Sequence, residues 1–90
     1  MKMKHHVIVY DIPEDDRRTK VANLLSGYGE RVQLSVFECW LDQGAREELK
    51  NSLLRILDLE EDAVRFYVVQ DEVDTIGIGG PLKPPGSYIV

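Results

Sequence analysis

The chain has 90 residues, enough for one domain, and a composition of 43% hydrophobic and 30% charged residues excludes an intrinsically disordered chain. Its one cysteine, Cys39, excludes an intrachain disulfide and a zinc cluster, and no stretch reaches the ~20 apolar residues of a membrane helix, so we expect a cytoplasmic protein without a membrane partner. The net charge of −5 argues against a polyanionic partner, but the acid excess lies wholly in residues 41–90, whereas residues 1–40 carry six basic and six acidic side chains and leave room for a local basic site.

The first predicted element is a strand over residues 5–12, which is rich in β-branched and aromatic side chains and apolar on both faces. A helix is predicted over residues 14–28, because Pro13 suits a first helical turn, the acidic residues after it favour a helix N-terminus, and apolar residues recur at helical spacing. Asp11 therefore stands at the junction between the strand and the helix.

A long strand is predicted next, over residues 31–42, and it is apolar on both faces. A second amphipathic helix is predicted over residues 45–57, and a further strand over residues 63–69, where the sequence is AVRFYVV. The residues DTIGIGG, at positions 74–80, are compatible with one more short strand.

We assign the chain to a single α+β domain spanning residues 1–90, with the ferredoxin-like order β-α-β-β-α-β and an extra short strand at the C-terminus. This order has two strands between the helices, whereas residues 31–42 are predicted as one. Residues 79–90 are expected to form an extended arm that ends in this strand. Two helices would cover one face of the sheet, so the second apolar face predicts a covering surface. A second copy of the chain, forming a homodimer, is the simplest source of that surface.

The region around Asp11 has two interpretations. In the structural one, Asp11 shapes the turn and the nearby Arg17 and Arg18 pair with it. In the functional one, the helix N-terminus and the two arginines bind phosphate, and Asp11 binds a metal ion. One aspartate offers too few ligands for a metal, but a two-fold dimer would bring a second Asp11, and a divalent cation would relieve the repulsion between them.

The stretch VYDIPEDDRRTKVANLLSGYGERVQLSVFEC, residues 9–39, resembles the small CRISPR-associated endonuclease family, whose members partner the CRISPR integrase. The resembling features are YDI at the end of the strand, DDRR.KVA at the start of the helix, and G.RVQ.SVFEC after it. The resemblance implies a ferredoxin-like homodimer in which Asp11 and its dimer mate bind one Mg²⁺. It also implies a nuclease acting on RNA or double-stranded DNA, and a role in spacer acquisition.

The resemblance further implies an active region around Asp11. The residues that match family positions of this region are Tyr10, Arg18, Arg31, Ser35 and Phe37. Lys20 departs from the pattern, because some members have arginine there.

Two functions from different classes are carried forward. The first, which we favour, is a magnesium-dependent phosphodiesterase, in which Arg18 and Arg31 stabilise charge on the phosphate. The second is a non-catalytic subunit that bridges DNA for the integrase. Neither His5 nor His6 is expected to act as a base, because both begin the first strand, far from Asp11, and are expected to be exposed.

Overall fold

The structure, a computed structural model, describes residues 2–77, which form four strands and two helices. In chain order the elements are β1 (Lys4–Asp11), α1 (Asp15–Ser26), β2 (Gly29–Gln33), β3 (Val36–Leu41), α2 (Gln43–Ile56) and β4 (Ala63–Val69). The predicted α+β class and the order β-α-β-β-α-β are therefore confirmed. No described helix is long and apolar enough to cross a membrane.

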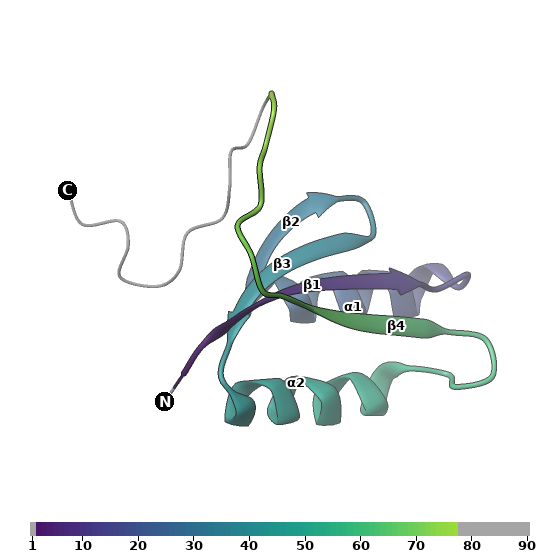
Figure 1. Ribbon diagram of the computed structural model, residues 1–90. Coiled ribbons are helices and arrows are strands. Elements are labelled where there is room, and N and C mark those ends of the chain that lie inside the picture. Colours follow the sequence, from purple (N-terminus) through teal and green to yellow (C-terminus); the bar gives the residue numbers. More distant parts are fainter. Residues whose placement is uncertain (1, 78–90) are drawn as a thin grey trace.

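The four strands form one antiparallel sheet in the order β2-β3-β1-β4, so β1 lies in the middle of the sheet. The two helices pack against each other and against one face of the sheet, and the other face is left without a helix (Figure 1). This is the ferredoxin-like arrangement expected from the sequence.

The predicted long strand over residues 31–42 was wrong, because this span forms a hairpin of β2 and β3 rather than one strand. The chain turns at Leu34 and Ser35, and the pairing of the hairpin slips between Arg31 and Gln33. Leu34 is 84% exposed at the turn, although an apolar residue at that position suggests a strand interior. The alternation of Val32, Leu34 and Val36 with polar residues continues through the turn and gives no signal for the break, which explains the error.

The core lies between the sheet and the helices and follows the predicted stripes. On α1, Val21 and Leu25 are buried, and on α2, Leu49 and Leu53 are buried. The strands contribute every second side chain to this core, as the period of a strand requires. These residues are Ile8, Tyr10, Phe37, Cys39 and Leu41.

The predicted C-terminal elements receive no support where the structure describes them. Residues 74–77 of the compatible strand 74–80 are not a strand, and Gly77 has a φ of 101°, which favours glycine. The remainder of that stretch and the predicted arm over residues 79–90 lie outside the described residues.

The face of the sheet without helices is largely apolar in its central part. Val7 and Val9 of β1 lie beside Val36 of β3 and Tyr67 of β4, and the three valines are half-buried while Tyr67 is 48% exposed. We call this side of the sheet the open face. The expectation that apolar side chains occupy both faces of β1 is thus confirmed, and the open face carries the surface from which we predicted a dimer.

A first prediction concerns Gly29, where β2 begins against β3. A Cβ at this position would overlap the carbonyl oxygen of Glu38 and lie 2.6 Å from the Sγ atom of Cys39. Gly29→Ala should therefore lower the free energy of unfolding by about 2 kcal/mol, as overpacking in a core does. Urea titration of the variant measures the change.

The matched control is Gly44→Ala, on the first turn of α2, where the nearest atom to a Cβ is 3.5 Å away. This variant should be as stable as the parent chain or slightly more stable, because alanine favours a helix. Equal stability of the two variants would contradict the close approach of β2 to β3.

Candidate functional site

Asp11 is the last residue of β1, and its side chain lies on the open face. It pairs with Ala63 of β4 and is exposed. Tyr10, the residue before it, is 3% exposed and lies on the helix-covered face, because successive side chains of a strand point to opposite sides. The structure therefore separates Asp11 from the Tyr10 side chain, although the two residues are neighbours in sequence.

Tyr10, Arg31, Ser35 and Phe37 come together at the tip of the β2–β3 hairpin. The Tyr10 hydroxyl donates to the carbonyl oxygen of Leu34 at 2.9 Å, and the Tyr10 amide donates to the carbonyl oxygen of Ser35 at 3.1 Å. The Arg31 guanidinium lies 5.4 Å from the centre of the Phe37 ring and donates to the Tyr10 oxygen at 3.5 Å, a long hydrogen bond.

This cluster connects the hairpin to the central strand. Phe37 is 1% exposed and so belongs to the core, although the resemblance implied a position in the active region. Among the four residues, Arg31 is exposed and forms no ion pair with any described residue, so its guanidinium is available to an anion.

At the start of α1, the chain itself supplies the hydrogen-bond acceptors for the free backbone amides. The Glu14 carboxylate accepts hydrogen bonds from the amides of Asp16 and Arg17, both at 2.9 Å, and these bonds lower the pKa of Glu14. Arg18 donates to the carbonyl oxygen of Ile12 at 2.9 Å and forms an ion pair with Asp15. A phosphate bound at this helix N-terminus would have to displace Glu14.

Arg17 is engaged in the most extensive ion-pair contacts of the described residues. Its guanidinium donates to both carboxylate oxygens of Asp62, at 2.8 and 3.2 Å, and to Glu61 at 3.3 Å. The Asp62 side chain is fully buried, and the hydrogen bond from Arg17 lowers its pKa. The expected pairing of Arg17 and Arg18 with Asp11 was wrong, because Arg17 joins α1 to the loop before β4 and Arg18 pairs with Asp15.

Metal ligands within one chain are few. Among residues 2–77, no group of three or more His, Cys, Asp and Glu side chains could hold a metal ion. Cys39 is buried, and burial raises the pKa of its thiol to about 11, which makes it a core residue rather than a nucleophile. Asp11 therefore offers a single carboxylate per chain, as the sequence indicated.

The prediction that His5 and His6 are exposed was wrong, since they are 7% and 2% exposed. His5 lies on the open face, where its Nε2 atom is 2.9 Å from the Glu38 carboxylate and its ring stacks on Trp40 at a centroid distance of 5.0 Å. The strand register pairs His5 with Trp40 and so brings their rings together. Predicting a strand from the first residues does not show which residues of the other strands lie beside the two histidines.

Comparisons with known proteins place the chain among CRISPR-associated proteins. The family model described as CRISPR associated protein Cas2 matches residues 3–75. A protein of Thermus thermophilus named CRISPR-associated endonuclease Cas2 2 is 52% identical over 79 residues, covering 88% of each chain. One of Synechocystis sp., named CRISPR-associated endoribonuclease Cas2 3, is 51% identical over 89 residues and covers 94% of this chain and 97% of its own.

Solved structures agree with these sequence matches. The crystal structure of Streptococcus pyogenes Cas2 at pH 6.5 has a TM-score of 0.73 and 33% identity, covering 81% of this chain and 99% of that one. A chain of a partial Cas6-RT-Cas1–Cas2 complex has a TM-score of 0.67 and 38% identity, covering 76% of this chain and 80% of that one.

A second prediction concerns the ion pair of Arg17 with Asp62. Because the pKa of Asp62 lies below that of an unfolded aspartate, about 3.9, the pair stabilises the fold above about pH 4. That stability is lost as the pH falls through the pKa of the folded carboxyl group. Urea midpoints of the parent chain should therefore fall between about pH 5 and pH 2, and Arg17→Gln should flatten this dependence.

Arg18→Gln is the matched control, because the partner of Arg18 is the Asp15 side chain, which is 84% exposed. This variant should keep the pH dependence of the parent chain. The same flattening in both variants would show that the buried position of Asp62 has no special effect.

Proposed function

The chain belongs to the CRISPR associated protein Cas2 family, and we propose that it acts as a homodimer with magnesium-dependent endonuclease activity on RNA or DNA. We also propose that it takes part in spacer acquisition with the CRISPR integrase as its partner. The names endonuclease and endoribonuclease of its relatives and the Cas1–Cas2 complex among its structural neighbours support this proposal.

The observation that carries the proposal is the position of Asp11. It is an exposed carboxylate at the end of the central strand, on the open face of the sheet. No ion pair with a described residue neutralises it, unlike Glu14 and Asp62. A carboxylate without an ion-pair partner, at the end of a paired strand, is suited to bind a cation that prefers oxygen ligands.

The open face that carries Asp11 is also the proposed dimer interface. Val7, Val9 and Val36 form an apolar area next to Asp11, and a second copy of the chain would remove it from water. In an isologous interface each residue near the two-fold axis meets its own copy, so a contact through Val9 would bring the two Asp11 carboxylates near each other. The pair would then offer ligands that a single chain lacks.

Magnesium fits this donor set, because carboxylate oxygens are its preferred ligands, and two Asp11 residues would hold it through their side chains. When bound, the ion supplies charge stabilisation at the scissile phosphate and a more acidic water molecule. The chain's own contribution lies in orientation. β1 fixes Asp11 through its pairing with Ala63 of β4. Arg31 lies with Tyr10 and Phe37 on the other face, so a phosphate that reaches it would have to pass the edge of the sheet.

The second candidate function is a non-catalytic subunit that bridges DNA in the integration complex. The engagement of Arg17 and Arg18 in contacts with the chain itself favours it, because these contacts leave few cations beside Asp11 to stabilise a cleaved phosphate. In this function the dimer matters and the carboxylate does not.

A third prediction separates the two candidates. Asp11→Asn should reduce magnesium-dependent cleavage of labelled RNA or DNA by about a hundredfold or more, since a metal ion contributes several kcal/mol to such reactions. It should also abolish the stabilisation of the parent dimer by magnesium in thermal unfolding. Asp16→Asn, an exposed acid on α1, is the control and should keep both properties.

If Asp11→Asn cleaves like the parent chain, the catalytic role of Asp11 is wrong. If neither protein cleaves, and both support spacer integration equally with the integrase, the bridging function replaces the catalytic one.

A fourth prediction tests the dimer. Val9→Arg places a charge in the middle of the open face beside Arg65 and should weaken dimerisation by at least about tenfold, because an unpaired charge would be buried. Sedimentation measures the change, and circular dichroism checks that the fold is kept.

Leu54→Arg is the control for this experiment. Leu54 is 57% exposed on α2, on the helical side of the molecule, and its replacement should leave the dimer intact. A parent chain that stays monomeric, or equal weakening by both variants, would contradict a dimer through the open face.

A further inference from the structure

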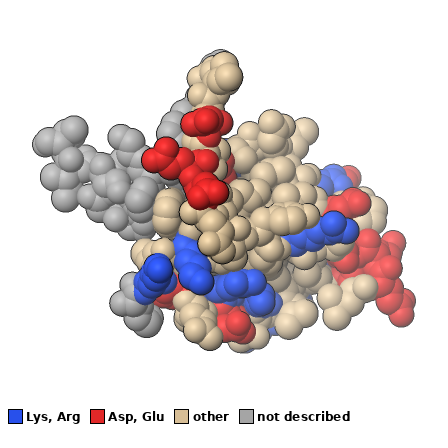
Figure 2. All heavy atoms as spheres, in the orientation of Figure 1, with Lys and Arg blue, Asp and Glu red and all other residues tan. Residues whose placement is uncertain are grey.

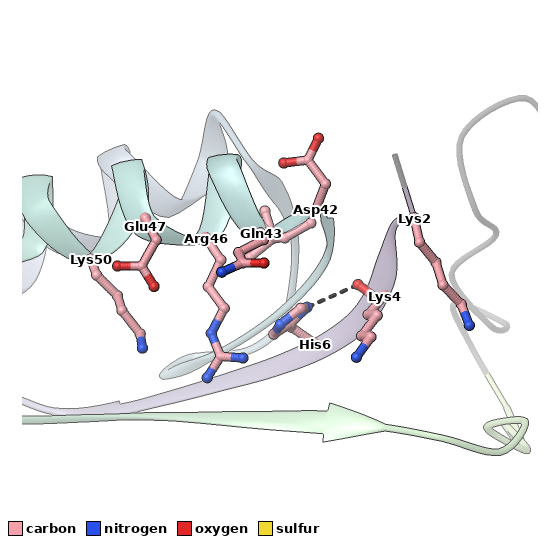
Figure 3. Close-up of a pocket in the computed structure, with 9 residues that line it drawn as sticks. Lys2, Lys4, His6, Asp42, Gln43, Arg46, Glu47 and Lys50 are labelled. Carbon is pink, nitrogen blue, oxygen red and sulfur yellow. Dashed lines mark hydrogen bonds between the residues drawn. The ribbon is translucent and has the colours of Figure 1, made fainter.

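A basic pocket lies between the beginning of β1 and the first turns of α2, on the helix-covered side. It has a volume of about 540 Å³. The residues that line it are Lys2, Lys4, His6, Leu41, Asp42, Gln43, Arg46, Glu47 and Lys50. Figure 3 shows the Arg46 and Lys50 side chains extending from α2 toward the strands, with Arg46 between Lys50 and His6 and with Lys4 on the other side of the His6 ring.

The charge of this pocket is opposite to that of the whole chain. Its lining has four Lys or Arg side chains and two carboxylates, whereas the chain carries −5. Of the two acids, Asp42 is partly occupied as the N-cap of α2, where its carboxylate accepts from the amide of Ala45 at 2.7 Å. Figure 2 shows Lys and Arg side chains gathered where β1 begins beside α2. The pocket therefore attracts anions locally.

The floor of the pocket contains unsatisfied polar atoms. His6 is 2% exposed, and its Nδ1 atom lies 2.8 Å from the carbonyl oxygen of Lys4. Because a carbonyl oxygen only accepts, Nδ1 carries the hydrogen, and in the neutral ring Nε2 keeps a lone pair. Neither this Nε2 nor the Nε–H of Arg46 has a hydrogen-bond partner among the described residues.

Such atoms are costly to bury, and a pair of them in one pocket requires an explanation. The cations around them have weak partners of their own. Arg46 and Lys50 both lie over the Phe66 ring, at 5.7 Å from its centre, and neither forms an ion pair with a described residue. The pocket thus presents several charged donors, and neither carboxylate in its lining, Asp42 or Glu47, forms an ion pair with them.

We propose that this pocket is a binding site for a phosphate group, with Arg46, Lys50 and Lys4 donating to its oxygens and His6 completing the site through Nε2. A tetrahedral phosphate offers several acceptor oxygens, which suits donors that converge from a strand and a helix. The phosphate can come from a free phosphate or from the backbone of a nucleic acid, and the chemistry of the pocket is the same for both.

The proposal includes uptake of one proton by His6. Burial lowers the pKa of His6, so the ring is neutral at pH 7 and cannot donate from Nε2. The groups that face the ring are Lys4 on β1 and Arg46 on α2, with Phe66 of β4 edge-on to it, whereas the neighbouring His5 points to the open face. The cations among them oppose protonation. An anion bound beside Nε2 reverses that balance, and the proton then becomes a donor to it.

This site is independent of the proposed nuclease function. His6 and Asp11 are five positions apart on β1, which is roughly 17 Å along an extended strand, and their side chains lie on opposite faces. Phosphate binding in the pocket requires neither magnesium nor the dimer, so Asp11→Asn should leave it unchanged.

The experiment follows the His6 ring by NMR in the full chain while inorganic phosphate replaces chloride at constant ionic strength. Phosphate should raise the pKa of His6 and shift its ring signals in a saturable way. Arg46→Gln should weaken phosphate binding by about tenfold or more, because it removes a charge-assisted donor. Lys20→Gln, an exposed cation on α1 outside the pocket, is the matched control and should bind like the parent chain.

A second arm adds a short nucleic-acid duplex in place of phosphate. Two results together would show that the duplex is the source of the phosphate: the duplex shifts the His6 signals, and Arg46→Gln weakens duplex binding more than Lys20→Gln does. The phosphate then belongs to a nucleic-acid backbone. If only inorganic phosphate acts, the site takes a free phosphate. The absence of a His6 response to either probe, or equal weakening by both variants, would overturn the proposal.

Discussion

The pairing of β1 on both of its edges is the constraint on which the remaining structure depends. Because β3 and β4 hold this strand in the middle of the sheet, its side chains must alternate strictly between two environments. Ile8 and Tyr10 enter the core beneath the helices, while Val7, Val9 and Asp11 emerge on the open face. The same alternation that builds the core therefore delivers a rigid carboxylate to the surface where a second copy of the chain would bind.

Electrostatic contacts around α1 restrict what the arginines can do. Arg17 is committed to the buried Asp62, and Arg18 to the loop that connects β1 with α1, so both contribute to the fold near Asp11. Among the cations that form no ion pair with a described residue are Arg31 on the hairpin and those around the His6 pocket. In the proposed function these few cations would contact the nucleic acid despite the net negative charge of the chain, because local charge decides contacts at a distance shorter than about 10 Å.

Much of the fold was predictable because it depends on local periodicity. The apolar spacing of residues 14–28 and 45–57 indicated both helices, and AVRFYVV matched β4 residue for residue. The hairpin inside residues 31–42 was missed, since its exposed apolar tip at Leu34 looks like strand interior. For the candidate site, Asp11 could be found from its position after a strand, but its separation from Tyr10 across the sheet depends on the pairing of β1.

By itself, the sequence determined the element types, the alternating core, the single-domain size, and the motifs that resemble the CRISPR-associated family. The chain length or residues close together in the sequence are enough to specify each of these features. Only the tertiary structure decided which partners the charged side chains receive. Arg17 pairs with Asp62, which is 45 positions away in the sequence. The His6 side chain is buried because α2 packs beside β1. Such contacts join segments that are distant in the chain, and no local spacing specifies the distance or the burial on which their energies depend.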